Sequence, residues 1–207
     1  MKSRILALLF FAAVSMPSFC QEEGTGPDKK WNYNVASNFY IFSDDFFVLP
    51  VFKADENRLH FEARYNYEDR ETFSAWAGYN FFGGDAFTYA VTPMVGAAVG
   101  RTKGLITGAE FEFGWKRFEL YSELEYLFDA ETNENNFFYG WTDLTFLPAD
   151  WWWLGVSGQR TRLFETSVEI EHGMLVGAAW KSLEISTYVY NFTVGEPFVL
   201  VSLAANF

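Results

Sequence analysis

The feature that most limits what this chain can fold into is a strict alternation of polar and apolar residues. From Leu59 to Tyr67 every odd-numbered residue is apolar or aromatic, and every even-numbered residue is polar. Residues 109–115 and 118–128 repeat the pattern, and no stretch shows the period of a helix. Because successive side chains of a β-strand point to opposite faces of the sheet, a period of two predicts strands. The chain is therefore expected to be all-β.

The chain divides into about twelve strand-like segments, with ten or fourteen strands as alternatives. The segments are 31–42, 46–54, 58–67, 72–82, 87–100, 104–115, 117–128, 137–147, 151–162, 167–180, 182–192 and 197–207. A tilted strand needs ~9–11 residues to cross a membrane, and most of these segments reach that length. An even number of strands would also return both ends of the chain to the same side of the membrane.

The predicted connections alternate between short and long. The short turns are Asp55-Glu56-Asn57, Gly83-Gly84-Asp85, Lys116-Arg117, Pro148-Ala149-Asp150 and Lys181-Ser182. The links on the other side, such as residues 129–136 and 191–197, are longer and more acidic. Short turns at one end and longer loops at the other are typical of transmembrane β-barrels. The pattern predicts a single closed, antiparallel, up-and-down barrel.

Aromatic residues favour a membrane barrel over a secreted β-sandwich. They make up 21% of the chain, although its mean hydropathy is only −0.04 and it has no long apolar run. Several lie at predicted strand ends, where membrane proteins carry an aromatic girdle. The predicted girdle residues are Phe81, Phe82, Phe137, Phe138, Trp151, Trp152, Trp153 and Trp180. A sandwich would have to place these rings in its core, and it would show fewer aromatics and a polar outer face.

The first thirty residues differ from the rest of the chain. Lys2 and Arg4 precede an apolar stretch over residues 5–16, which is the layout of a secretory signal peptide over residues 1–20. Small residues at Ser18 and Cys20 fit cleavage after Cys20, and lipidation of Cys20 is the alternative. Residues 21–30 are predicted to be a flexible lead-in, and residues 31–207 are predicted to form the barrel.

Charge and cysteine content exclude several classes of function. Cys20 is the only cysteine, so the mature chain would have no disulfide, thiolate metal cluster or cysteine nucleophile. Without Lys2 and Arg4, 13 basic residues face 27 acidic ones, a formal charge of −14. Such a surface argues against nucleic acid as a partner. The two histidines offer no clustered metal-ligand spacing, so neither a metal nor a cofactor is predicted.

The last eleven residues alternate in the same way and end in phenylalanine. The apolar positions are Val199, Val201, Leu203, Ala205 and Phe207. In this strand the chain resembles Gram-negative outer-membrane β-barrel proteins as a class. The resemblance implies recognition by periplasmic chaperones and the barrel-assembly machinery, insertion among outer-membrane lipids, and both termini in the periplasm.

The polar face of the predicted strands is expected to line the lumen. The residues assigned to it are His60, Glu62, Arg64, Glu110, Glu112, Glu119, Tyr121, Glu123, Glu125, Asp143, Glu169, Glu171 and Glu184. One interpretation is an acidic lumen that passes small cations, with Arg64, and less securely Arg160 and Arg162, as counter-ions. The other is that any closed barrel needs a polar interior whose charges pair in a network.

The leading prediction for function is non-enzymatic: a narrow channel or a structural barrel with an acidic lumen. A lipid- or lipid A-modifying enzyme is an alternative that would need a histidine base beside a nucleophile. His60 has Arg58 and Glu62 at the neighbouring positions of its face, and His172 shares the lipid-facing parity of Met174. A surface-exposed binding protein acting through its acidic loops is a second alternative.

Overall fold

The structure is a computed structural model that describes residues 31–161 and 170–207. The predicted signal peptide, the lead-in, Cys20, Arg162 and Glu169 lie outside the described residues. The strands are β1 (Asn32–Ile41), β2 (Phe46–Glu56), β3 (Leu59–Tyr65), β4 (Thr72–Tyr79), β5 (Phe81–Gly83), β6 (Phe87–Gly100), β7 (Gly104–Trp115), β8 (Phe118–Asp129), β9 (Phe137–Ala149), β10 (Trp152–Arg160), β11 (Glu171–Trp180), β12 (Leu183–Tyr190) and β13 (Phe198–Asn206). A single helical turn, η1 (Asn133–Asn135), precedes β9. In this part of the chain no helix is long and apolar enough to cross a membrane.

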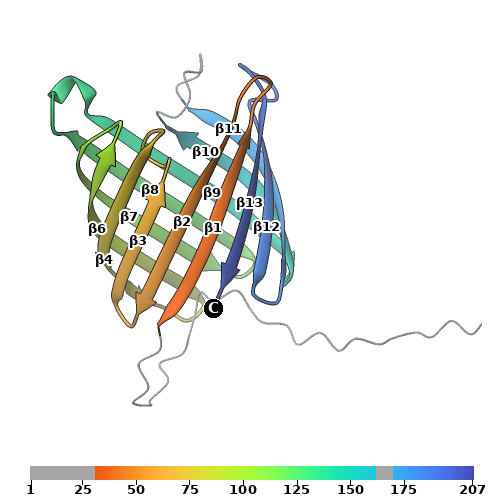
Figure 1. The fold of residues 1–207 in the computed structure, drawn as a ribbon. Helices are drawn as coiled ribbons and strands as arrows, with labels where there is room; N and C mark the ends of the chain where they lie inside the picture. Colours follow the sequence, from red (N-terminus) through yellow and green to blue (C-terminus); the bar gives the residue numbers. More distant parts are fainter. Residues whose placement is uncertain (1–30, 162–169) are drawn as a thin grey trace, which may run out of the picture.

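Twelve antiparallel strands close into a barrel (Figure 1). Each strand of the ring pairs with its neighbours in sequence, and β1 closes the ring by pairing with β13 from Asn34↔Asn206 to Ile41↔Val199. The predicted fold class and strand number are confirmed. The segment predicted as one strand over 72–82 is divided at Asn80, whose side chain bonds Asp55 and Thr92. Beyond that residue β5 pairs with β6 alone, while β4 completes the ring.

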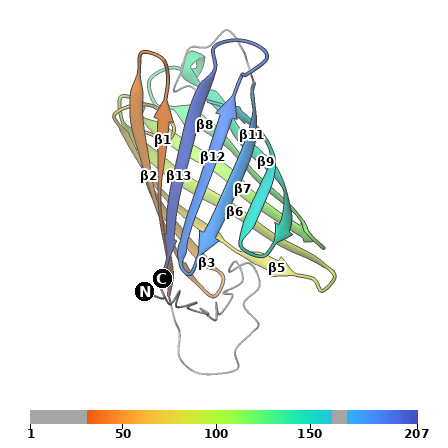
Figure 2. The same cartoon turned by 90° about the vertical axis from the view of Figure 1, so that its right-hand side faces the viewer.

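The two ends of the barrel are built differently, as the view in Figure 2 shows from the side. The end formed by residues 57–58, 84–86, 116–117, 150–151 and 181–182 carries tight turns, and we call it the turn end. Asn57, Lys116 and Lys181 adopt positive φ there, as tight hairpin turns require. The opposite end, which we call the loop end, carries residues 42–45, 66–71, 101–103, 130–136 and 191–197. Both chain ends of the barrel lie at the turn end, where Tyr33 and Phe207 exchange backbone hydrogen bonds of 3.1 and 2.9 Å.

Two of the turns are shorter than the sequence predicts. β2 continues through Glu56 and β9 continues through Ala149, so only two residues remain in each connection. At Gly84 the backbone φ is +100°, and a Cβ atom there would lie 1.9 Å from the carbonyl oxygen of Phe87. Glycine is therefore required at that turn.

The outer face of the barrel is apolar and aromatic. Along β3 the exposed residues Leu59, Phe61 and Tyr65 alternate with buried polar ones. Among the predicted girdle residues, Trp152 is half-buried and five others are exposed: Phe81, Phe82, Phe138, Trp151 and Trp180. This face would be unstable in water but suits a lipid environment.

Phe137 and Trp153 differ from the prediction that they belong to the girdle, because both pack inside the barrel. Phe137 shares its face with the buried residue Tyr139. The pairing of β10 with β9 shifts register between Trp152 and Leu154, so the run of three tryptophans does not keep one face. Gly177 on β11 leaves room for the Trp153 ring, since a Cβ there would lie 2.3 Å from Trp153 Cε2.

Part of the interior is filled by apolar and aromatic side chains. We call this group the aromatic cluster; its buried members are Tyr40, Phe47, Leu49, Val51, Tyr67, Tyr139, Trp141, Leu175, Tyr188, Tyr190, Phe198 and Leu200. Rings of Tyr188, Tyr190 and Phe198 stack in series, with centroids 5.9 and 4.9 Å apart. These side chains are at most 7% exposed, so packing closes this part of the barrel.

Candidate functional site in the barrel interior

The most polar part of the interior is built on β3. His60, Glu62 and Arg64 are spaced two residues apart and all point inward, where each is 1–3% exposed. The antiparallel register places Asp55 of β2 opposite His60, and Lys53 opposite Glu62. Period-two alternation and strand register therefore bring five titratable groups together along two neighbouring strands.

Arg64 links β3 to a strand that is not its neighbour. Its Nε donates to Glu62 Oε2 at 2.5 Å, and its Nη1 donates to Glu123 Oε1 at 2.6 Å and Glu125 Oε1 at 2.5 Å. Glu123 and Glu125 lie on β8, and β4, β6 and β7 separate β8 from β3 around the ring. The guanidinium therefore crosses the interior and ties opposing walls together.

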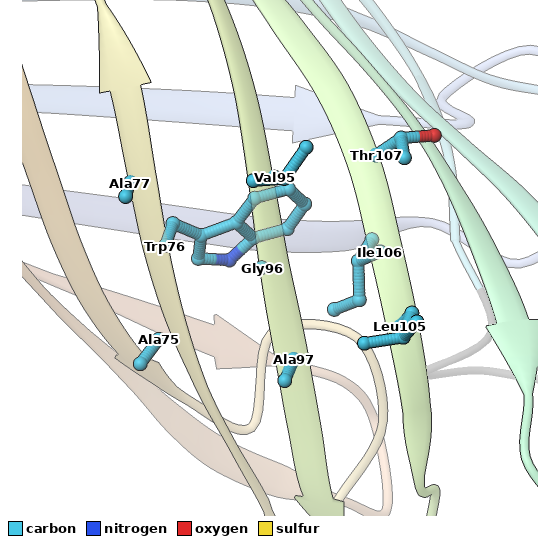
Figure 3. Close-up of a pocket in the computed structure, with 9 residues that line it drawn as sticks. All are labelled: Ala75, Trp76, Ala77, Val95, Gly96, Ala97, Leu105, Ile106 and Thr107. Carbon is cyan, nitrogen blue, oxygen red and sulfur yellow. The ribbon is translucent and has the colours of Figure 1, made fainter.

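Small residues on β6 make room for this arrangement. The Trp76 indole lies against Gly96, where a Cβ atom would come within 2.6 Å of Trp76 Cδ2 (Figure 3). Trp76 in turn packs against the Arg64 guanidinium at 4.9 Å, and the Tyr67 ring lies 4.3 Å from the guanidinium carbon. Outside, the exposed Ala75, Ala77 and Ala97 form a shallow apolar depression over the same strands.

A second connection crosses the barrel through Lys53. Its ammonium group bonds Glu110 on β7 and lies 3.3 Å from Glu62 Oε1. Tyr121 on β8 donates to Glu110 Oε1 at 2.9 Å and is 2.9 Å from Glu123 Oε2. His60 completes the group, with its ring nitrogens 2.8 Å from Asp55 Oδ1 and 2.7 Å from Glu62 Oε1. We call these nine residues the polar network: Lys53, Asp55, His60, Glu62, Arg64, Glu110, Tyr121, Glu123 and Glu125.

Carboxyl groups outnumber cations in the polar network. Asp55 and four glutamates face Lys53, Arg64 and His60. An unpaired charge costs several kcal/mol in so dry an environment, so the network must hold protons or attract further cations. The excess of carboxyl groups thus favours the binding of protons or other cations at the polar network.

Three further predicted lumen residues lie nearer the turn end. Glu112, Glu119 and Glu184 each stand within four residues of a turn and are only half-buried. Glu184 accepts a hydrogen bond from Asn206 at 2.9 Å. Together with Asp55 they give this mouth of the barrel an acidic lining.

Two other predicted lumen residues belong to a different part of the interior. Asp143 accepts hydrogen bonds from Ser157 at 2.5 Å, Trp141 at 2.7 Å and Tyr188 at 3.0 Å, all within or beside the aromatic cluster. Glu171 is bonded by the side chain of Asn191 at the loop end.

Whether Arg160 neutralises charge in the lumen stays a prediction, and the residue lies near the loop end. It follows Gln159, whose side chain is buried inside, and its own guanidinium donates to the carbonyl of Phe138 at 3.2 Å near the loop end. Because three tryptophans run in sequence over residues 151–153, the sequence did not show which residues of β10 face inward. The structure also places a cation in the interior at Lys53.

Sequence reasoning did not identify Lys53 as a lumen residue. Its inward-facing companions on β2 are Phe47, Leu49 and Val51, so the inner face of this strand is apolar over most of its length. The rule that polar residues face inward therefore does not show which residues of β2 face the lumen. The inward face of β3 is clear from its alternation, and the short turn at Asn57 fixes how β2 pairs with β3. Together they would have placed Lys53 beside Glu62.

A group with metal-ligand chemistry emerges only in three dimensions. Single ligand atoms of His60, Glu62 and Glu110 lie within 4.8 Å of one another. Their spacing in sequence gave no sign of it, because Glu110 comes from another wall of the barrel. In the structure the ammonium group of Lys53 bonds two of the three and supplies the positive charge at this point.

The final strand β13 alternates as the sequence indicates. Leu203 and Phe207 are exposed and Val199, Val201 and Ala205 are half-buried, whereas Phe198 and Leu200 are buried inside. Pairing of this strand with β1 closes the barrel. Its recognition by assembly machinery stays a prediction.

Comparison with known proteins identifies the fold. No protein-family model matches the chain, and no curated protein matches it. Among solved structures, the chain is similar to the KdgM porin, with 10% sequence identity, a TM-score of 0.57, and coverage of 85% of this chain and 98% of that chain. The same porin in complex with disordered oligogalacturonate gives a TM-score of 0.58, with 10% identity and coverage of 85% and 99%. The chain therefore has the fold of an outer-membrane β-barrel.

Proposed function

We propose that this protein is a narrow outer-membrane channel that prefers small cations. The observation that carries the proposal is the bridge from Arg64 to Glu62, Glu123 and Glu125. It narrows the interior where carboxyl groups outnumber cations. A structural barrel would need a polar interior too, but it would not need this excess of negative charge.

The charge of the interior supports cations as the solute. Rings of carboxylates select cations in channels, and a low-dielectric wall strengthens the effect. The half-buried carboxyls at the turn end would draw cations from water into the mouth. The KdgM porin in the matching complex holds an oligogalacturonate, which carries carboxylates of its own. An acidic sugar of that kind does not suit the acidic interior of this chain.

The packing supports a small solute. Twelve strands enclose more space than the eight of a filled barrel and less than the sixteen of an aqueous porin. The aromatic cluster takes up part of that space. The polar network crosses the rest, with Arg64 1% exposed and Glu123 2% exposed. Passage would therefore depend on local movement of charged side chains rather than on a permanent opening.

The proposed setting is the outer membrane, with lipid around the apolar face. We place the turn end in the periplasm, because short turns lie on that side in barrels of this type. Both termini would then be periplasmic, after removal of the signal peptide over residues 1–20. Insertion would proceed through chaperones and the barrel-assembly machinery, with β13 as the recognised strand.

The arrangement favours a channel rather than an enzyme. Both ring nitrogens of His60 contact carboxylates, which leaves neither available to a hydroxyl nucleophile. His172 is exposed on the outer face, between the exposed residues Ile170 and Met174. A surface-binding role through the acidic loops has less support, because Glu131, Glu134 and Glu196 are exposed to water.

Current recording in planar bilayers tests the proposal. The refolded protein is expected to give small steps whose reversal potential, in a tenfold KCl gradient, has the sign of potassium preference. The double variant Glu119→Gln/Glu184→Gln removes negative charge from the mouth and should reduce that preference. Asp150→Asn, at an exposed turn outside the interior, is the matched control and should leave it unchanged.

Two results would contradict the proposal. One is a reversal potential with the sign of chloride preference. The other is the absence of current from protein that still shows the heat-modifiable migration of a folded barrel, which would indicate a closed structural barrel.

A further inference from the structure

We propose that the polar network binds one divalent transition-metal ion, of the kind typified by Zn²⁺, between His60, Glu62 and Glu110. The inference deepens the proposed function, on which it rests for the entry of cations through the acidic mouth, by naming a class of cation that the interior holds. Ligand atoms of the three residues lie within 4.8 Å of one another. An imidazole nitrogen with two carboxylate oxygens is a ligand set that suits Zn²⁺.

Two walls of the barrel supply the ligand atoms. His60 and Glu62 lie on the inner face of β3, where Nε2 of His60 is 2.7 Å from Glu62 Oε1. Glu110 comes from β7, beyond β4 and β6 around the ring. All three side chains are buried, with exposures of 3–5%. Because Zn²⁺ takes nitrogen and oxygen ligands at about 2.0–2.2 Å, rotation of the two glutamate side chains is enough to close the site around the ion.

The imidazole of His60 is held in the way that a metal-binding histidine is held. Its Nδ1 lies 2.8 Å from Asp55 Oδ1. A histidine that binds a metal through one nitrogen usually donates its other N–H to a carboxylate or carbonyl, which fixes the ring and its tautomer. Asp55 is fixed in turn, because it accepts a hydrogen bond from the Asn80 side chain at 2.7 Å, and Asn80 accepts one from Thr92 at 2.7 Å. The interruption between β4 and β5 at Asn80 therefore supports the position of His60.

The two glutamates are oriented by partners of their own. Arg64 Nε donates to Glu62 Oε2 at 2.5 Å, and the other carboxylate oxygen, Oε1, faces His60. Tyr121 on β8 donates to Glu110 Oε1 at 2.9 Å. Partners of this kind strengthen metal binding because they hold the ligand atoms in place before the ion arrives. Each of the three ligand residues thus has a partner that keeps it in place.

The ammonium group of Lys53 marks the place of the ion. It bonds Glu110 and lies 3.3 Å from Glu62 Oε1, so it is the positive charge that the two carboxylates share. The Lys53 side chain is 23% exposed, whereas those of the three ligand residues are at most 6% exposed. Its long stem lets the ammonium group swing toward water and give up its place. At Nε2 of His60 the ion takes the place of the hydrogen between that nitrogen and Glu62.

The composition of the polar network favours a divalent transition metal over other cations. Its five carboxyl groups face two permanent cations, Arg64 and Lys53, and a metal-bound His60 is neutral. A divalent ion offsets more of this excess than a monovalent ion does. Mg²⁺ and Ca²⁺ are bound by oxygen ligands, so the imidazole nitrogen selects against them.

Carboxyl groups lead from the turn end to the site. Glu112 lies two residues from Glu110 on the same face of β7, nearer the turn, and is half-buried. The Asp55 side chain is 34% exposed and adjoins His60. A mouth lined with negative charge raises the local concentration of cations. A metal ion that enters there meets these carboxylates before it reaches the imidazole.

Isothermal titration calorimetry with Zn²⁺ tests the inference on the refolded mature protein in detergent. The wild type is expected to bind one Zn²⁺ ion per barrel with an affinity that depends on the site. His60→Gln keeps a polar side chain but removes the nitrogen ligand, and it should weaken Zn²⁺ binding at least tenfold. The matched control His172→Gln removes the exposed histidine of the outer face and should leave the affinity unchanged.

Two further variants separate the roles of the neighbouring residues. Lys53→Met keeps an unbranched side chain but removes the competing ammonium group, so it should strengthen Zn²⁺ binding at least tenfold. Asp55→Asn removes the carboxylate behind His60 and should weaken the binding about tenfold. Heat-modifiable migration confirms that each variant is folded. If His60→Gln does not fold, the opposite changes in these two variants decide the matter.

The outcomes separate this inference from the proposed function. Equal Zn²⁺ affinity in the wild type, His60→Gln and Lys53→Met would overturn the site, whatever the potassium current. Loss of binding in His172→Gln instead of His60→Gln would also overturn it. Zn²⁺ binding that depends on His60, in a barrel that gives no potassium steps, would support the site and contradict the channel.

Discussion

The two halves of the interior are closed by different means. The polar network joins β2, β3, β7 and β8 through ion pairs, whereas the aromatic cluster draws mainly on β1, β2 and β9–β13 and closes its half by packing. Apolar packing depends on the volume and shape of the side chains. A region held by ion pairs depends on the charge of each partner. Loss of one partner leaves a buried charge unpaired, which costs more stability than the loss of the same side-chain volume from an apolar region.

This difference indicates which half of the interior a cation would pass through. In the aromatic half, stacked rings such as Tyr190 and Phe198 fill the space. The carboxyl group of Asp143 beside them already accepts hydrogen bonds from Ser157, Trp141 and Tyr188. In the network, each carboxylate released by Arg64 becomes a site for another cation. Under the proposed function, the polar half is therefore the half expected to open, and the aromatic half supports it. The following variants are chosen to break or sharpen this contrast.

The largest loss of stability is expected from Arg64→Met. The change leaves Glu62, Glu123 and Glu125 buried without their shared guanidinium, which should cost about 3–5 kcal/mol of unfolding free energy. Urea titration of the refolded barrel measures it. The control Arg101→Met removes an exposed pair with Asp69 at 3.5 Å and should cost at most about 1 kcal/mol. Equal losses in the two variants would show that burial of the network adds nothing.

A comparable but smaller loss, about 3 kcal/mol, is expected from Phe198→Ala in the aromatic cluster. Phe198 is 2% exposed and stacks on Phe42 and Tyr190 at 4.7 and 4.9 Å. Because no charge is lost, the change in unfolding free energy should be the same at low and high salt. A strong salt dependence for this variant would contradict the division between the two halves.

An intermediate effect is expected where packing supports the network. In Gly96→Ala the new Cβ would meet Trp76 at 2.6 Å and the carbonyl of Ala75 at 2.8 Å, so the indole must shift away from its place beside Arg64. Overpacking of this kind costs about 1–3 kcal/mol. Gly158→Ala is the control, because its Cβ would find its nearest neighbour at 3.9 Å. Urea titration and tryptophan fluorescence should change in the first variant and stay constant in the second.

The smallest effect concerns pH at the loop end. Burial raises the pKa of Glu68, which lies between β3 and β4. The folded state then binds a proton more tightly than the unfolded state, so the unfolding free energy falls as pH rises from the usual glutamate value through the raised pKa. Glu68→Gln should remove this slope and leave the barrel more stable than the wild type at neutral pH. A slope that persists in the variant would assign it to another group.

The sequence predicts most of the architecture because alternation is a local property. Leu59 to Tyr65 specify both faces of β3 by themselves, and the tight turns at Asn57, Lys116 and Lys181 set the register of the hairpins. The closed barrel follows from that pattern repeated. Where both faces of a segment are apolar, as around Val51, or where three tryptophans adjoin, the pattern no longer indicates which side faces inward.

The interior contacts could be predicted only in part. His60, Glu62 and Arg64 were assigned to the lumen from parity, and the structure buries all three. Their partners on β8 depend on the diameter of the barrel and on which strands lie opposite each other. Sequence spacing does not encode that distance, so the role of Lys53 emerges only in the folded chain.

Single-channel conductance of Arg64→Gln and Phe198→Leu, recorded side by side with the wild type, tests the central claim most directly. The account predicts that Arg64→Gln raises the conductance at least twofold and keeps potassium preference, because the bridge between β3 and β8 is lost. Phe198→Leu should leave the conductance unchanged. The opposite result, a larger current in Phe198→Leu and none gained in Arg64→Gln, would contradict the claim that the polar network is the half of the barrel that opens.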